Sequence, residues 1–197
     1  PEGRKGQGFT ILSSGRFVGL WGLDFTIRSY PPTHHHLPVH QRPFVRLVLV
    51  GDGPYKKYLE NLAEEMEVAE CVTFIAWLHR SDYKKLYNES DVFLFPSHEG
   101  AGMVVAEALS YGLPVVCFRN EGPGEFVNKD CGISVPYSRY NTSVTKFAEA
   151  LRLLHDNTRL YVKLSEGARR TFKERFDWDL KGERLKDLYE NLTRKAG

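Results

Sequence analysis

Short apolar segments alternate with amphipathic segments along most of the chain. The apolar segments show almost no polar alternation, which is typical of strands that are buried on both faces. They cover residues 9–14, 45–54, 71–78, 91–97, 114–118 and 131–136. Segments with helical spacing of apolar residues lie between them, at 22–30, 55–68, 81–90 and 102–111. This alternation predicts an α/β fold, namely a Rossmann-like parallel sheet of about six strands with helices on both faces.

From Asn141 onward the pattern is only helical. One apolar stripe consists of Val144, Phe147, Ala148, Leu151 and Leu154, and a second consists of Leu185, Leu188, Tyr189 and Leu192. Both stripes predict helices that pack against the rest of the domain. Earlier in the chain, Ser81 is the predicted N-cap of one helix. Gly112 is the predicted left-handed cap that ends another, before the strand that starts at Pro114.

Charge and composition narrow the function classes. The 197 residues include 27 basic and 25 acidic side chains, which gives a net charge of +2. Because this balance lacks the strong basic excess of a nucleic-acid-binding protein, we expect no nucleic-acid partner. No apolar run approaches the roughly 18 residues of a membrane-spanning helix, so a soluble protein is expected.

The cysteines favour a reducing compartment. Cys71, Cys117 and Cys131 are odd in number, lack CxxC spacing and lie within or beside apolar segments. Buried reduced thiols are therefore favoured over a disulfide or a catalytic role. The expected location is the cytoplasm.

Two polar segments are expected to lie outside the packed fold. Residues 1–8 resemble a linker, which suggests a piece of a longer protein and leaves residues 9–197 as one domain. Residues 30–43 carry four prolines and four histidines without periodicity, which predicts an exposed loop. The histidines are His34, His35, His36 and His40. Solvated side chains are favoured over metal ligands there, because a loop lacks the ordered surroundings that orient such ligands.

Three turns are expected at the edge of the sheet where ligands bind. Ligands of an open parallel sheet bind beyond the carboxyl ends of its strands, and SSGR, GDGP and PSHEGAG follow the first, second and fourth strands. The helix that begins near Gly102 presents free backbone N–H groups and the positive end of its dipole. The small residues Gly100 and Ala101 let a ligand approach that backbone closely. Such a terminus suits a phosphate or a sugar hydroxyl.

Two glutamates flank this helix start. Glu99 precedes the small-residue turn, and Glu107 can lean back toward the same cleft because helical side chains tilt toward the N-terminus. A carboxylate at that point can accept hydrogen bonds from a diol such as a ribose. Spacing alone is no evidence, since Glu166 and Glu174 have the same spacing inside an amphipathic helix. The order of strand, proline, glutamate, small-residue turn, helix and glutamate is what singles out the first pair.

The segments ILSSGR, LVGDGP, SDVFLFPSHEGAGMVVAEALSYGLPVV, GISVP, FDWDL and LYENL cover nearly the whole chain. Together they resemble the C-terminal, donor-binding half of a GT-B glycosyltransferase, most closely glycosyltransferase family 4. The resemblance implies retaining transfer of a hexosyl group from a nucleoside-diphosphate sugar to a glycan or lipid-linked acceptor, with no metal or other cofactor. It also implies an N-terminal acceptor domain, absent from this chain, and association with the inner face of a membrane.

The resemblance assigns roles to individual residues. Glu99 lies on the family position near the donor sugar, Glu107 on the position that binds the ribose, and Arg16 on the position that grips the donor diphosphate. Arg16 and Glu99 are therefore the expected catalytic residues, and the base is expected near Leu78. The expected donor-binding set is Gly15, Arg16, Leu78, Glu99, Gly100, Ala101, Gly102, Met103, Val104 and Glu107.

One position departs from the family pattern. The family usually has Lys-Gly shortly after the arginine, whereas this chain has Trp21-Gly22. Loss of a cation weakens stabilisation of the leaving diphosphate unless another basic group substitutes. A non-catalytic sugar-nucleotide-binding or scaffold module is therefore the alternative interpretation.

Two further motifs are disfavoured as sites. A nicotinamide-dependent oxidoreductase is a weaker hypothesis, because GQG at residues 6–8 precedes its strand and GDGP lacks a third glycine. DWD at Asp177 to Asp179 mimics a metal-binding motif. It lies between amphipathic segments, where an aspartate N-cap is the favoured interpretation.

Overall fold

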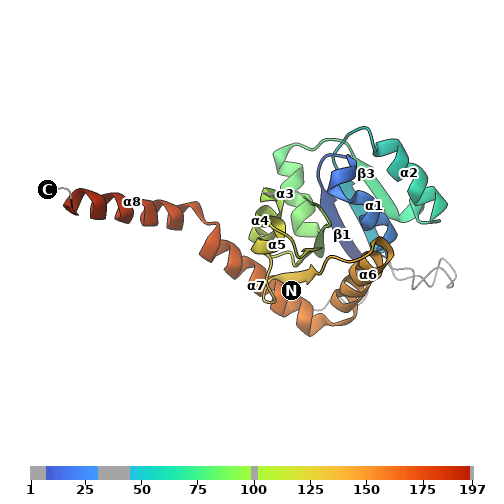
Figure 1. Ribbon diagram of the computed structural model, residues 1–197. Helices are drawn as coiled ribbons and strands as arrows, with labels where there is room; N and C mark the ends of the chain where they lie inside the picture. The colour runs from blue at the N-terminus through green and yellow to red at the C-terminus, as the bar shows by residue number, and fades with distance from the viewer. Residues whose placement is uncertain (1–7, 31–44, 99–101, 196–197) are drawn as a thin grey trace.

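The computed structural model describes residues 8–30, 45–98 and 102–195, which fold around a six-stranded sheet (Figure 1). The strands are β1 (Phe9–Ser14), β2 (Val45–Val50), β3 (Val72–Ile75), β4 (Val92–Phe95), β5 (Val115–Phe118) and β6 (Gly132–Val135). Their order is β3-β2-β1-β4-β5-β6, and every neighbouring pair is parallel. The predicted fold class is confirmed.

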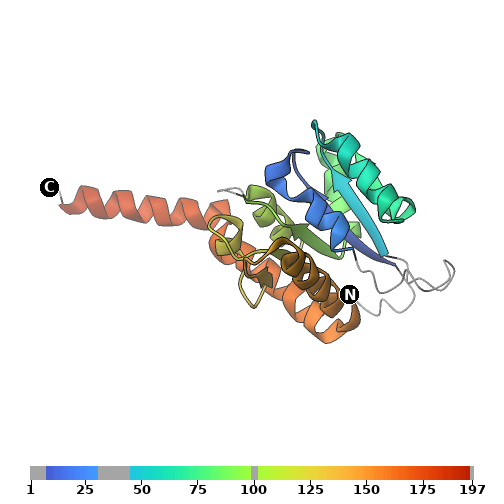
Figure 2. The same cartoon turned by 45° about the vertical axis from the view of Figure 1, so that its right-hand side comes forward.

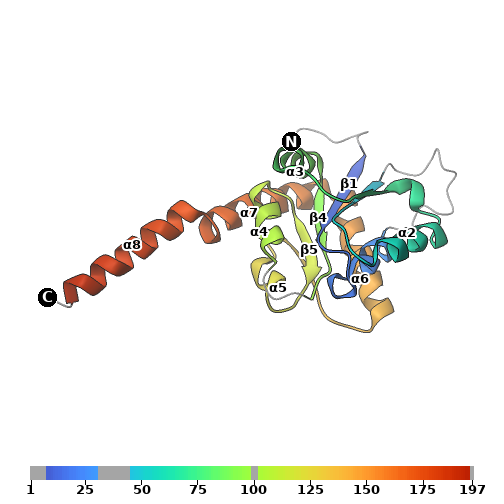
Figure 3. The ribbon, with the colours of Figure 1, turned by 90° about the horizontal axis from the view of Figure 1, so that it is seen from above.

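Helices cover both faces of the sheet (Figures 2 and 3). The helices α1 (Leu23–Arg28), α2 (Lys56–Glu65) and α6 (Tyr140–Asp156) contribute to one buried cluster, and α3 (Arg80–Glu89) and α4 (Met103–Ser110) contribute to the other. Helix α7 (Thr158–Arg175) contacts α4 and α6 and supplies residues to both clusters, and the short α5 (Pro123–Phe126) lies beside α4.

Successive residues of each strand point to opposite faces, so the sheet has a core on each side. Ile11 and Leu12 are at most 1% exposed and belong to different clusters. Val116 and Cys117 divide in the same way. Because both faces are covered, each strand needs apolar residues at nearly every position, which explains the lack of polar alternation.

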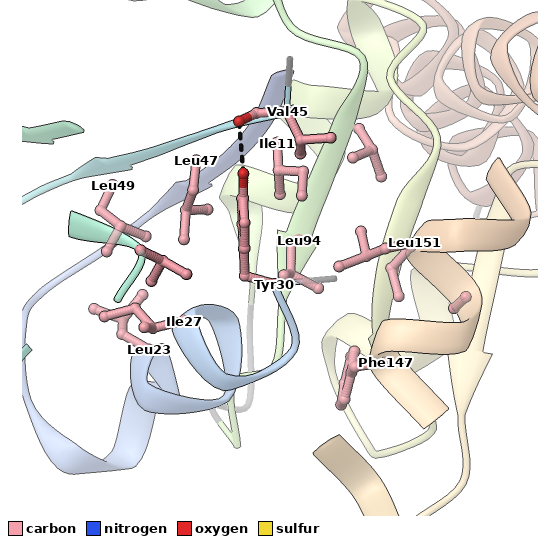
Figure 4. Packing of buried hydrophobic residues seen from close by; sticks show 14 of the residues in the cluster. Ile11, Leu23, Ile27, Tyr30, Val45, Leu47, Leu49, Leu94, Phe147 and Leu151 are labelled. Carbon is pink, nitrogen blue, oxygen red and sulfur yellow. Dashed lines mark hydrogen bonds between the residues drawn. The ribbon is translucent and has the colours of Figure 1, made fainter. Parts of the chain in front are cut away.

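The cluster under α1, α2 and α6 includes a buried tyrosine that corrects one prediction (Figure 4). Tyr30 is 8% exposed, and its hydroxyl donates a hydrogen bond to the backbone carbonyl of Val45 at 2.7 Å. The predicted exposed loop at 30–43 is therefore wrong for its first residue, whose ring packs in the core. The rest of that loop, with its four histidines, lies outside the described residues, as does the linker-like segment before Gly8.

The structure confirms one predicted helix cap and corrects another. Gly112 has φ 75° after α4, a left-handed conformation that favours glycine, and the Arg169 side chain packs beside it. The N-cap of α3 is His79, whose Nδ1 accepts a hydrogen bond from the backbone N–H of Ser81 at 3.3 Å. The predicted Ser81 cap is wrong, because Ser81 already lies in the first helical turn.

All three cysteines are free, as predicted. Cys117 and Cys131 are buried, whereas Cys71 is only half-buried. Burial raises the pKa of Cys117 to about 12, with a smaller contribution from Cys131. Cys117 is therefore a protonated, packed thiol rather than a nucleophile at neutral pH.

The two C-terminal apolar stripes have different surroundings. On α6, Phe147, Leu151 and Leu154 are at most 1% exposed, as predicted. Helix α8 (Trp178–Lys195) instead projects away from the body of the domain (Figures 1 and 3). Its stripe is 51–61% exposed at Leu185, Leu188, Tyr189 and Leu192, so the prediction that this helix packs against the domain is wrong. An amphipathic pattern shows that one face of a helix is suited to packing, but it does not show which part of the molecule covers that face. Within the described ranges, no helix is both long and apolar enough to cross a membrane.

Candidate functional site

The strand order reverses direction between β1 and β4. From β1 the chain adds β2 and β3 on one side, then returns to add β4, β5 and β6 on the other. Such a topological switch point is where open α/β sheets bind ligands, beyond the carboxyl ends of the strands. Two contacts join the segment that follows β1 to the last residue of β4 and to the residue after it. The rings of Trp21 and Phe95 pack edge to face, with their centroids 5.7 Å apart. A Cβ on Gly22 would lie 2.3 Å from the Pro96 carbonyl oxygen.

The turn after β1 has a fixed backbone. Gly15 donates its N–H to the Val50 carbonyl, and Phe17 donates its N–H to the Asp52 carbonyl, each at 2.9 Å. The Phe17 ring is fully buried. Arg16 lies between these anchors with an exposed side chain, and its guanidinium makes no hydrogen bond or ion pair to any residue that the structure describes. The arginine therefore projects a cation from a rigid backbone.

Trp21, the residue that departs from the family pattern, packs onto this turn. It belongs to the short 3₁₀ helix η1 (Gly19–Trp21), is half-buried and contacts both hydrophobic clusters. A Cβ added to Gly15 would lie 1.8 Å from the six-membered ring of the indole. The indole therefore lies directly on the Gly15 backbone, beside the carboxyl end of β1.

Helix α4 starts at the same edge of the sheet. Gly102 is its N-cap, with φ 58°, and a Cβ there would lie 2.6 Å from Pro123 Cγ. No described side chain caps the helix, so within the described ranges the first-turn backbone N–H groups are not occupied by a cap. Met103 is 60% exposed, and Val104 is half-buried against the second cluster. Glu99, Gly100 and Ala101, the other predicted members of this turn, lie outside the described residues.

Glu107 is exposed on α4, and its carboxylate has one hydrogen-bond partner among the described residues. The Tyr87 hydroxyl donates to its Oε2 at 3.4 Å. Burial, with a smaller contribution from the Glu107 carboxylate, raises the pKa of Tyr87 and also that of Tyr83. Both tyrosines therefore stay protonated at neutral pH and can donate hydrogen bonds near this carboxylate.

The structure also places Leu78 and shows residues that sequence reasoning missed. Leu78 is half-buried in the turn between β3 and α3 and packs against the second cluster. The adjacent Trp77 is 78% exposed. Tyr83 and Tyr87 were not among the predicted site residues. Their spacing of four within the helix predicted over 81–90 was the available signal, since such residues share a helix face.

The DWD motif is structural, as predicted. Asp177 directly precedes α8, and its Oδ1 accepts a hydrogen bond from the backbone N–H of Asp179 at 3.0 Å. This is N-cap geometry. Across residues 8–30, 45–98 and 102–195, no group of three or more His, Cys, Asp or Glu side chains is arranged to hold a metal ion.

Comparison with known proteins places the chain among sugar transferases. Residues 1–171 match the family described as glycosyl transferases group 1. A GDP-mannose-dependent monoacylated alpha-(1-6)-phosphatidylinositol monomannoside mannosyltransferase of Corynebacterium glutamicum is 28% identical over 97% of this chain and 51% of its own length. The lipopolysaccharide core biosynthesis glycosyltransferase LpsD of Rhizobium meliloti is 28% identical over 95% of this chain and 51% of its length. The chain thus spans about half the length of these curated relatives.

Solved structures agree on the fold. WaaG, a glycosyltransferase involved in lipopolysaccharide biosynthesis, superimposes with a TM-score of 0.70 and 27% identity, over 87% of this chain and 44% of its own. The pneumococcal O-GlcNAc transferase GtfA, solved with UDP and GlcNAc, gives a TM-score of 0.77 at 19% identity, over 95% of this chain and 37% of its own. With the sheet and helix arrangement of these GT-B glycosyltransferases and a family match across most of its residues, the chain belongs to the glycosyl transferases group 1 family.

Proposed function

We propose that the chain is the donor-binding half of a retaining glycosyltransferase of family 4. It binds a nucleoside-diphosphate sugar, from which a hexosyl group is transferred to a glycan or lipid-linked acceptor. The observation that carries the proposal is the convergence of the Arg16 turn and the start of α4 at one switch point. The family match and the relatives' activities support it.

The proposed diphosphate site combines a side-chain cation with a helix terminus. Arg16 projects from an anchored turn, and α4 begins at the neighbouring strand end with no cap from a described side chain. Uncapped N–H groups and the helix dipole favour an anion at that terminus. The guanidinium supplies a fixed positive charge for the diphosphate that leaves when the glycosidic bond to the donor breaks. The site as proposed requires no metal or other cofactor.

The remaining donor contacts follow the same edge of the sheet. Glu107 accepts hydrogen bonds from the ribose hydroxyls, and the base lies near Leu78. Glu99 and the backbone of 100–104 contact the sugar and the diphosphate. Gly102 supports this arrangement because its lack of a side chain keeps the start of α4 close to Pro123.

Acceptor binding is assigned to a second, N-terminal domain. The chain spans about half of the curated relatives that it matches, and the apolar stripe of α8 has no partner among the described residues. One relative is named for a phosphatidylinositol mannoside acceptor and another for the lipopolysaccharide core. These names support a lipid-linked or glycan acceptor, a role in polysaccharide biosynthesis and work at the cytoplasmic face of a membrane.

Calorimetric titration of the chain with UDP, GDP and ADP and their hexose conjugates tests the donor site. Glu107→Gln should weaken binding of the preferred nucleotide by about 1–3 kcal/mol, the range of a charge-assisted hydrogen bond. Glu174→Gln is the matched control, because Glu174 is an exposed glutamate on α7 with the same spacing to another glutamate. It should leave binding unchanged. Absence of binding by all three nucleotides and their conjugates would contradict the donor assignment.

Trp21 favours a second candidate function, a sugar-nucleotide-binding module with weak or no transfer. At the position where the family has a lysine, an indole covers Gly15 beside the carboxyl end of β1. A site with one fixed cation stabilises the departing diphosphate less than a site with two. In this alternative the chain binds the nucleotide without efficient turnover.

Trp21→Lys separates the two candidates. If the position faces the diphosphate, lysine should raise the affinity for UDP relative to UMP by up to about tenfold, which corresponds to ~1.4 kcal/mol. Trp178→Lys adds the same charge on α8, where the tryptophan is 78% exposed, and should leave that ratio alone. A thermal melt of each variant checks that the packing on Phe95 is not essential for folding. An unchanged ratio in folded Trp21→Lys would show that this turn does not face the diphosphate, and it would weaken the role of Arg16.

A further inference from the structure

The contact between α3 and the Glu107 carboxylate points to a residue with a role in the donor site. Tyr87 is 1% exposed, yet its hydroxyl reaches an exposed carboxylate on the neighbouring helix at 3.4 Å. Glu107 has no other hydrogen bond or ion pair from its carboxylate to a described residue. Among the described residues, the buried Tyr87 hydroxyl is therefore the group that can orient the carboxylate of the proposed ribose site.

Packing fixes the position of the Tyr87 ring. The ring stacks on Tyr111 with centroids 4.9 Å apart and planes 8° apart. The rings of Tyr83 and Phe93 also contact it, with centroids 5.9 Å and 6.2 Å from that of Tyr87. These neighbours come from α3, from the end of α4 and from β4. Since a close-packed ring cannot change rotamer without disturbing three elements, the phenol oxygen has a defined position.

The protonation states suit donation from tyrosine to glutamate. Burial in the core is the main cause of the raised pKa of Tyr87, and the nearby carboxylate raises it further. The phenol therefore stays protonated and donates to the carboxylate, which in turn keeps its other oxygen free to accept hydrogen bonds. A ribose diol offers two hydroxyl donors to such an acceptor.

We infer that Tyr87 is a positioning residue that holds the Glu107 carboxylate in the orientation that accepts the ribose diol. The inference rests on the proposed function, because it assumes that Glu107 binds ribose. Glutamate on an exposed helix face has several free torsions, and a hydrogen bond from a fixed partner reduces the ordering needed when the ligand binds. Tyr87 acts through Glu107 and does not itself touch the nucleotide.

The experiment measures how strongly binding depends on the ribose hydroxyls. Calorimetry gives the affinities of the chain for UDP, GDP and ADP and for the 2′,3′-dideoxy counterpart of whichever binds most tightly. The affinity for the ribonucleotide divided by the affinity for its dideoxy counterpart measures the contribution of the diol. Loosening of the whole domain would weaken the binding of both ligands equally and leave this ratio unchanged. Tyr87→Phe keeps the ring and its stacking and removes only the hydroxyl. It should lower the ratio by about threefold, as expected for loss of one net hydrogen bond.

Tyr30→Phe is the matched control. Tyr30 is also a buried tyrosine, and its hydroxyl donates a hydrogen bond to the Val45 carbonyl at 2.7 Å, but it belongs to the hydrophobic cluster on the other face of the sheet from Tyr87 (Figure 4). Its loss should destabilise the domain to a similar or greater extent and leave the affinity ratio unchanged. An equal fall in the ratio with Tyr30→Phe would mean that general stability controls the ratio, and the inference would be overturned.

The double variant separates this inference from the proposed function. If Tyr87 acts through Glu107, then Glu107→Gln lowers the ratio and adding Tyr87→Phe lowers it no further. If Glu107→Gln leaves the ratio unchanged, Glu107 does not bind ribose and the proposed role of Glu107 fails. If Glu107→Gln lowers the ratio but Tyr87→Phe does not, the proposed function stands and Tyr87 is only a packing residue.

Discussion

Helices α7 and α8 are each 18 residues long, amphipathic and interrupted by one glycine, yet they have opposite surroundings. Helix α7 lies against α4 and α6, and Ser165 donates a hydrogen bond from its hydroxyl to the Gly112 carbonyl at 2.7 Å. Leu164 is 1% exposed there. On α8 the equivalent apolar side chains are more than half exposed, and Leu188 is 54% exposed. The same sequence pattern thus describes a helix with a partner and a helix without one.

The glycines show the difference most directly. A Cβ on Gly167 of α7 would lie 1.7 Å from the backbone carbonyl oxygen of Asp130, whereas a Cβ on Gly182 of α8 would meet nothing within 4 Å. Gly167 is therefore a packing requirement, since only a residue without a side chain allows α7 to approach the chain before β6. Gly182 has no such role in the described part of the molecule. The comparison shows that amphipathic spacing indicates a need for burial and that only the fold supplies the partner.

The largest expected effect comes from removing a buried side chain of α7. Leu164→Ala should lower the free energy of unfolding by about 2–5 kcal/mol, because it deletes apolar contacts and leaves a cavity. Leu188→Ala makes the same chemical change on α8 and should cost less than about 0.5 kcal/mol, as exposed substitutions do. Urea denaturation followed by tryptophan fluorescence and circular dichroism measures both. Equal losses in the two variants would show that the α8 stripe is buried in solution, for instance against a second copy of the chain, and the contrast would break.

Smaller effects are expected at the two glycines, and they differ in sign between Gly167 and Gly182. Gly167→Ala should destabilise the domain by about 1–3 kcal/mol, because α7 must move away from the Asp130 carbonyl to admit a methyl group. Gly182→Ala should instead stabilise the helical conformation of α8 by about 0.5–1 kcal/mol, since alanine loses less conformational freedom than glycine when a helix forms. Denaturation midpoints report the first change and helical ellipticity reports the second. A stabilising Gly167→Ala would mean that α7 does not approach the Asp130 carbonyl as closely as described.

The candidate site divides between residues that local sequence could identify and residues that it could not. Gly102 and Glu107 lie within one strand-turn-helix motif, so their order along the chain was enough to place them at the same helix start. Tyr87 is 20 positions before Glu107, and the two meet only because α3 packs beside α4. The resemblance identified Trp21 as the departure from the family lysine. That its indole lies on Gly15 depends on the way η1 folds back over β1.

The sequence by itself determined the elements of this protein: a strand buried on both faces needs an unbroken apolar run, and a left-handed helix end needs a residue such as Gly112. These requirements are local, so the residues of each segment are enough to reveal them. Strand order, the meeting of the turns after β1 and β4, the Tyr87 contact and the exposure of α8 were decided only by the tertiary structure. The physical reason is that hydrophobic periodicity reports which face of an element avoids water, whereas the identity of the neighbour depends on how distant elements pack together.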